Sequence, residues 1–191
     1  YLPIFVLREM DRHRTLDIDD TVIESVTDFR KYNSKNEFSG RYASMPCDFY
    51  IPSLDRIKGQ DTVNKQGSSG ELPAETKQYF KDTTELNSAA NRVAYEHALT
   101  ELKVSRELAR INLPLNQFTR IRITANFVNW AKLLKLRLAS DAQWEIQEYA
   151  KAIAAIIKER WPLTFEVYEK HSLTPISFST DELAVLTTKL L

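Results

Sequence analysis

The chain has 191 residues, 43% of them hydrophobic and 27% charged, and its 26 lysines and arginines match its 26 aspartates and glutamates. This predicts one globular domain over residues 1–191, and formal neutrality excludes a global field that would draw the protein to nucleic acid or an anionic membrane. The single cysteine excludes an internal disulfide and a cysteine-based zinc site, and no apolar run approaches the roughly 20 residues that cross a bilayer. We therefore expect a cytoplasmic protein with no metal site and no membrane partner.

The first predicted element is a helix that starts near Pro3, whose missing N–H is harmless in a first helical turn. It runs to a basic triplet at residues 12–14. Tyr1 opens directly into an apolar run, so we expect a further segment to precede it. Residues 15–35 mix acidic with apolar side chains, a pattern compatible with a short helix or an inserted hairpin on the surface.

The middle of the chain predicts a loop, a strand, a second loop and a long helix. Residues 36–42 (NEFSGRY) have the glycine and asparagine of a shaped loop, and residues 49–51 predict a short strand that a proline ends. Residues 60–73 hold two of the four glycines and predict the clearest loop. From Pro73 to about Leu102 there is no internal glycine or proline, which predicts a long helix.

The last part of the chain predicts mostly helix. A short helix follows from Ser105 and ends before Pro114, and residues 121–124 alternate apolar and polar side chains as a strand does. Apolar residues then recur at helical spacing over 127–138. Capping boxes predict two further helix starts, at Ser140-x-x-Gln143 and at Ser179-x-x-Glu182. These elements indicate an α+β fold with helices in the majority.

Three groups of residues could hold a phosphate: the triplet Arg12-His13-Arg14, the loop from Glu37 to Tyr42, and the pair Arg110 and Arg137. Arginine offers a planar fork of donors, and a Ser-Gly pair lets backbone N–H groups approach the same anion. Ordinary explanations stay open for each. A basic cluster at a helix end can be a solvated face, Ser-Gly-Arg is a common turn, Arg110 can pair with Glu107, and Arg137 can pair with Asp141 or Glu145.

Four stretches together resemble the flavin-dependent thymidylate synthases: LPIFVLREMDRHRT, NEFSGRYASMPCDFYIP, RELARINLPLNQFTR and RLASDAQWEIQEYA. They occur in the same order and span nearly the whole chain. The resemblance implies a helix-rich fold with a central mixed or antiparallel sheet and a homotetramer with shared active sites. It implies dUMP as the substrate, FAD as the cofactor, and NADPH and methylenetetrahydrofolate as co-substrates, with no cysteine nucleophile.

The resemblance also assigns roles to individual residues of this sequence. Arg137 is the expected catalytic residue, held against the uracil ring. The implied FAD-binding residues are Arg12, His13, Arg14, Glu37 and Asn126. The implied dUMP-binding residues are Arg12, Glu37, Phe38, Ser39, Gly40, Arg41, Arg110 and Arg137.

The sequence departs from the family pattern at four site positions. Glu9 stands where glutamine is usual, Val128 replaces arginine, Lys132 replaces asparagine and Asp141 replaces histidine. Residues 15–35 also lengthen the spacer inside the signature. The sequence therefore leaves two functions open: an active synthase, and a catalytically altered or inactive nucleotide-binding homologue. Nucleic-acid binding is disfavoured because no long basic stripe is present.

Overall fold

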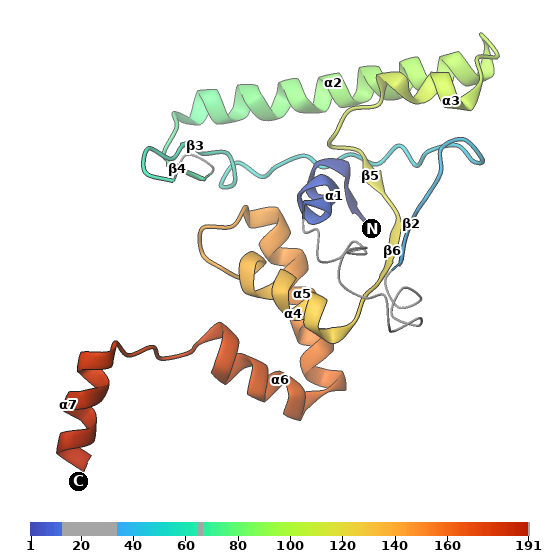
Figure 1. Cartoon of the computed structure of the whole chain (residues 1–191). Helices are drawn as coiled ribbons and strands as arrows, with labels where there is room; N and C mark the ends of the chain where they lie inside the picture. Colours follow the sequence, from blue (N-terminus) through green and yellow to red (C-terminus); the bar gives the residue numbers. More distant parts are fainter. Residues whose placement is uncertain (13–33, 65–66, 191) are drawn as a thin grey trace.

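The computed structural model describes residues 1–12, 34–64 and 67–190 of the chain (Figure 1). Over these residues it confirms the α+β class, with helix as the main element. Short helical turns follow two of the α-helices, a 3-10 turn at Arg110–Asn112 and a π turn at Glu169–Leu173. The α-helices are α1 (Ile4–Asp11), α2 (Ala74–Thr100), α3 (Arg106–Ala109), α4 (Phe127–Arg137), α5 (Trp144–Arg160), α6 (Pro162–Tyr168) and α7 (Thr180–Leu190).

The described strands form three separate antiparallel pairs. Strand β1 (Leu2–Pro3) pairs with β5 (Phe118–Thr119), β2 (Ser34–Glu37) pairs with β6 (Ile121–Thr124), and β3 (Gly59–Gln60) pairs with β4 (Ser68–Gly70). Only Arg120 separates β5 from β6, so β1 and β2 lie along one extended segment (Figure 1). This segment brings the start of α1 and the end of β2 to the same side of the molecule.

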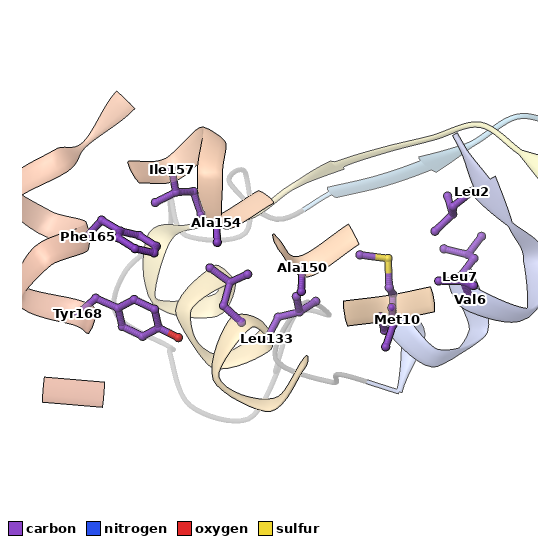
Figure 2. Packing of buried hydrophobic residues seen from close by; sticks show 12 residues of the cluster. Leu2, Val6, Leu7, Met10, Leu133, Ala150, Ala154, Ile157, Phe165 and Tyr168 are labelled. Carbon is purple, nitrogen blue, oxygen red and sulfur yellow. The ribbon is translucent and has the colours of Figure 1, made fainter. Parts of the chain in front are cut away.

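The core lies between α1, α4, α5 and α6. Val6, Leu7 and Met10 of α1 are buried, as are Leu133 and Leu134 of α4, and Figure 2 shows α1 and α4 residues on either side of Ala150. Burying one such aliphatic side chain stabilises the fold by roughly 1.5–3 kcal/mol. These contacts fix the C-terminal ends of α1 and α4, which carry two of the expected site residues.

Helix α2 lies apart from this core (Figure 1). Of its 27 residues only Ser88 and Tyr95 are buried. Both make polar contacts, because the Tyr95 hydroxyl accepts a hydrogen bond from the Met45 N–H at 2.9 Å and Ser88 Oγ accepts one from Asn116 Nδ2 at 3.0 Å. The long helix predicted from the missing glycine and proline is confirmed, and most of its surface faces away from the core.

Some expected boundaries were wrong. Residues 49–51 form no strand, because Phe49 makes only an isolated bridge with Gln117. The loop predicted over residues 60–73 contains the last residue of β3 and the whole of β4, which pair as antiparallel strands. Helix α5 starts at Trp144 rather than at a Ser140 cap, since the Gln143 side chain donates to Glu145 Oε2 at 2.8 Å. By contrast, the cap at Ser179 is confirmed by the bond from the Glu182 N–H to Ser179 Oγ at 3.3 Å.

The acidic stretch at residues 15–35 falls mostly outside the described residues. Its last two members, Ser34 and Lys35, are part of strand β2, opposite Thr124 and Ile123. The C-terminal end of the stretch expected as a surface insertion is therefore paired with β6, and this backbone pairing begins before residue 36. Residues 36 and 37, expected in a loop, belong to the same strand.

Candidate functional site

The expected site residues that the structure describes fall into two groups. The first, the Glu9 cluster, consists of Glu9 and Arg12 near the end of α1 and Arg137 at the end of α4. Glu9 Oε1 lies 3.0 Å from Arg12 Nη1, and Glu9 Oε2 lies 3.5 Å from Arg137 Nη2. The predicted pairing of Arg137 with Asp141 or Glu145 is thus not the ion pair that forms. One carboxylate instead bridges two guanidinium groups from different helices.

The second group, the Ser39 loop, consists of residues 39–41 together with Arg110. Ser39 closes a tight turn: its Oγ accepts from the Arg41 N–H at 3.3 Å and its carbonyl oxygen accepts from the Tyr42 N–H at 3.2 Å. Gly40 is buried, and a Cβ added there would lie 3.5 Å from Arg110 Cδ. The structure therefore brings the loop and Arg110 together, as the dUMP assignment requires.

Glu107 lies between the two arginines of the Ser39 loop. Its Oε2 is 3.8 Å from Arg41 Nε, and its backbone carbonyl accepts a hydrogen bond from Arg110 Nε at 3.4 Å. Arg110 therefore contacts Glu107, the acid that the sequence offered as its partner, through the backbone carbonyl oxygen of Glu107. Both arginines are exposed, so their forks can reach a ligand in solvent. Two guanidinium groups beside a glycine turn suit a phosphate dianion.

Strand β2 connects the two groups. At its start Lys35 Nζ lies 3.0 Å from Asp11 Oδ1 of α1, and at its end Glu37 Oε1 accepts a hydrogen bond from Thr119 Oγ1 at 2.9 Å. Phe38 follows, and its N–H donates to the Arg120 carbonyl at 2.8 Å. An extended chain from Lys35 to Ser39 spans about 13 Å. Within one chain the expected dUMP residues therefore form two centres rather than one.

Two further expectations have different outcomes. Asn126 is the N-cap of α4, where its side chain accepts a hydrogen bond from the Asn129 N–H at 2.9 Å. Asparagine is one of the residues that N-cap positions prefer, so this contact gives Asn126 a structural role in the helix. His13 and Arg14 lie outside the described residues.

Sequence reasoning missed a polar network around Glu145. This carboxylate accepts two bonds from Arg56, from Nε at 2.7 Å and from Nη2 at 3.0 Å, and one from the Tyr50 hydroxyl at 2.9 Å. Burial alone would raise the pKa of Glu145, but the hydrogen bonds from Arg56, Gln143 and Tyr50 outweigh it and hold that pKa below its usual value. Arg56 and Glu145 are 89 residues apart in the sequence, so no local sequence pattern predicts their ion pair.

The comparisons with known proteins decide the family. The model of the family described as "Thymidylate synthase complementing protein" matches residues 1–163. The chain belongs to this family. The resemblance seen in the sequence motifs is confirmed.

Related proteins of this family carry the name flavin-dependent thymidylate synthase. The chain is 39% identical to one from Thermus thermophilus over 186 residues, which is 96% of the chain and 60% of that relative. It is 35% identical over 185 residues to one from Ehrlichia ruminantium strain Gardel, of which it covers 56%, and 30% identical over 187 residues to one from Dictyostelium discoideum, of which it covers 55%. The chain therefore spans less than two thirds of the length of these relatives.

The fold is also that of solved structures. The UMP/dUMP methylase PolB from Streptomyces cacaoi bound with 5-Br UMP superposes with a TM-score of 0.72 at 22% sequence identity, over 92% of this chain and 73% of that one. The same enzyme bound with 5-Br dUMP gives a TM-score of 0.70 over 91% of this chain and 70% of that one. At this identity the likeness establishes the fold.

The remaining departures from the family pattern lie at the surface. Val128 and Lys132 are exposed on α4. Asp141 is exposed in the turn before α5, where it lines a cleft of about 860 Å³ between that turn and the β3–β4 pair. Within the described residues, the walls of this cleft include none of the expected dUMP ligands. The cleft and the arginine groups are therefore separate features of this family member.

Among the described residues there is no group of three or more histidine, cysteine, aspartate or glutamate side chains placed to hold a metal ion. No described helix combines the length and the apolar character that crossing a membrane requires.

Proposed function

We propose that this chain is part of an FAD-dependent thymidylate synthase that methylates dUMP to dTMP, with methylenetetrahydrofolate as the carbon donor and NADPH as the reductant. Family membership supports the activity, and one observation carries the substrate. That observation is the approach of Arg110 to the buried Gly40 in the Ser39 loop. It joins backbone donors and two arginine forks, from segments far apart in the sequence, at one place on the surface.

The phosphate of dUMP is assigned to the Ser39 loop. Phosphate prefers bidentate guanidinium donors and backbone N–H groups over isolated ammonium groups. Arg41 and Arg110 supply the forks, and the Ser39 turn presents the backbone. Glu37 and Phe38, directly before the turn, are held by Thr119 and Arg120 and so fix the entry to the loop.

The uracil ring is assigned to Arg137. The side chain of Arg137 is only 20% exposed, and its stem packs at the end of α4 while its guanidinium group meets Glu9. A cation that is fixed before the reaction stabilises negative charge as it develops on the pyrimidine. Arg137 would therefore act on the charge of the ring and not on the phosphate.

The donor set near α1 fits an anionic dinucleotide such as FAD. The Arg12 side chain is 75% exposed, and its planar fork suits a phosphate oxygen. His13, Arg14, Glu37 and Asn126 complete the proposed FAD residues. Held by these residues, FAD would supply the hydride-transfer chemistry of the reaction, with NADPH as the source of reducing equivalents.

We also propose a homotetramer with shared active sites. Tyr79, Leu86 and Val93 are exposed on α2 and spaced by seven residues, which places them on one stripe of the helix. Such a stripe suits packing against the same helix of a second copy. Because one chain holds its dUMP residues in two centres, joining copies can bring complementary centres together. Light scattering of the full-length protein should give four copies per particle.

The deciding experiment uses the full-length protein. Methylation at C5 of the uracil displaces the hydrogen there, so dUMP labelled with tritium at C5 should release tritiated water. Release should require dUMP, NADPH and methylenetetrahydrofolate together, and the purified protein should show flavin absorbance. Tritium release without folate, or none with all three present, would contradict the proposed reaction.

A second candidate is a nucleotide-binding homologue with altered or no turnover. It is favoured by one observation, the engagement of Arg137 by Glu9. The variant Arg137→Lys separates the two, because a point charge cannot reproduce a planar fork in the transition state. If Arg137 is catalytic, turnover should fall about a hundredfold while dUMP binding weakens only moderately.

The matched control is Arg160→Lys, at the exposed end of α5, which should leave turnover unchanged. Retention of more than half of the turnover by Arg137→Lys would show that the catalytic assignment is wrong. Binding of dUMP by the unmodified protein with no tritium release would select the second candidate.

A further inference from the structure

The Glu9 cluster places an anion between two cations that the proposed function gives to nucleotide ligands. Arg12 approaches Glu9 from the same helix, at 3.0 Å, and Arg137 approaches it from α4, at 3.5 Å. The two guanidinium groups use different oxygens of the one carboxylate. The Glu9 carboxylate therefore lies where an anionic ligand would also attract both arginines.

The burial of the three side chains is unequal. Those of Glu9 and Arg137 are 24% and 20% exposed, whereas that of Arg12 is 75% exposed. Charges that are partly withdrawn from water are screened less than charges at the surface. The Glu9–Arg137 contact is thus the inner and more persistent one, and Arg12 is free to turn outward to a ligand. The neighbouring ion pair of Asp11 and Lys35 adds no net charge to the cluster.

We propose that Glu9 is a built-in counter-anion that competes with nucleotide phosphate and with other anionic groups for Arg12 and Arg137, and that it lowers the affinity of the site for anionic ligands. This inference rests on the proposed function. Glu9 is a tuning residue in this role: it changes the charge that the ligand meets and does not itself act on the reacting atoms.

The size of the effect follows from Coulomb's law. Glutamine has the shape of glutamate and no charge, so Glu9→Gln raises the local charge by one unit while its amide oxygen can still accept from Arg137. A unit charge some 6–8 Å from a ligand anion, in a strongly screened environment, changes the dissociation constant by about three- to tenfold. Because the proposed function gives Arg12 to a phosphate of FAD, the variant should bind FAD about three- to tenfold more tightly at low salt.

The test is calorimetric titration of FAD into the flavin-free full-length protein, at about 30 mM and about 300 mM salt. The advantage of Glu9→Gln should shrink at the higher salt, because added ions screen the extra charge. Glu9→Asp keeps the charge and should stay within about twofold of the unmodified protein. Riboflavin, which lacks the phosphates, should bind both forms equally.

The control variant is Glu166→Gln, which removes an exposed carboxylate paired with Lys170 on the far helix α6 and changes the net charge by the same amount. It should not alter FAD affinity. Thermal melts should show that Glu9→Gln keeps its fold. A merely structural role for Glu9 would lower the melting temperature and leave the salt dependence of binding unchanged.

Two outcomes are distinguishable. If the unmodified protein does not bind FAD, the proposed function is wrong. If it binds FAD and Glu9→Gln binds FAD equally or more weakly at low salt, the proposed function stands and the role of Glu9 as a counter-anion is overturned.

Discussion

Replacement of Gly40 by alanine tests whether the Ser39 loop is shaped by side-chain packing. Gly40 has no positive φ, so alanine introduces no backbone strain there. A Cβ at this position would instead lie 2.8 Å from Met45 Sδ and 2.9 Å from Met45 Cγ. Both atoms belong to the flexible end of the Met45 side chain, which must turn aside, whereas the Met45 backbone N–H stays held by the Tyr95 hydroxyl of α2.

The expected magnitude is the low end of the range for a small-to-large change in a packed site, about 1 kcal/mol of lost stability, because a flexible side chain yields. For a chain of this size each kcal/mol lowers the melting temperature by roughly 2–4 °C. Removing the Met45 side chain beyond Cβ should relieve the clash. Gly40→Ala should therefore cost much less stability in the Met45→Ala background than in the unmodified protein.

The assay is a double-mutant cycle by thermal and urea unfolding, with dUMP titrations of all four forms. Gly70→Ala is the matched control, because a Cβ there meets its nearest atom at 3.6 Å, an ordinary contact. Equal costs of Gly40→Ala in both backgrounds would refute the steric explanation. If Met45→Ala restores stability but not dUMP affinity, the methyl group itself blocks the ligand.

Three further predictions concern other parts of the chain. Because the pKa of Glu145 is held below its usual value, its ion pair should stabilise the fold above about pH 4.3 and lose that effect as the pH falls through the lowered value. Glu145→Gln should flatten this part of the melting profile and destabilise by about 3 kcal/mol or more at pH 7, since it leaves Arg56 without its buried partner charge. Lys103 has a φ of 54°, so Lys103→Gly should raise the free energy of unfolding by about 1 kcal/mol in urea titrations, and an unchanged or lower value would contradict this. Arg41→Ala should weaken dUMP binding by roughly 2–3 kcal/mol in calorimetry, and a change below about threefold would remove Arg41 from the phosphate site.

The sequence was most informative where structure is local. The run from Ala74 to Thr100 has no glycine or proline, and it is one helix as predicted. The alternation at residues 121–124 is a strand, and the box at Ser179 caps the last helix. In each case the contacts that decide the structure join residues close together in the sequence, so the local sequence pattern is enough to predict them.

Prediction failed where a distant contact overrides a local preference. Ser140 and Gln143 have the residue types of a capping box, yet α5 begins at Trp144 because Gln143 turns to Glu145, which Arg56 also holds. The run at residues 49–51 has strand residues but only one bridging partner, Gln117. A propensity of a few tenths of a kcal/mol cannot prevail over a buried charged network.

By itself the sequence determined the family, the α+β class and the residue types of the proposed nucleotide site. Sequence motifs and the spacing of hydrophobic residues can be recognised without knowing which distant residues meet. Tertiary structure alone decided which charges meet. Only packing of α1 against the core beside α4 brings Glu9 to Arg137, and only the turn at Ser39 brings Gly40 to Arg110. The physical reason is that an ion pair depends on distance in space, and residues far apart in sequence acquire that distance only when the hydrophobic core closes.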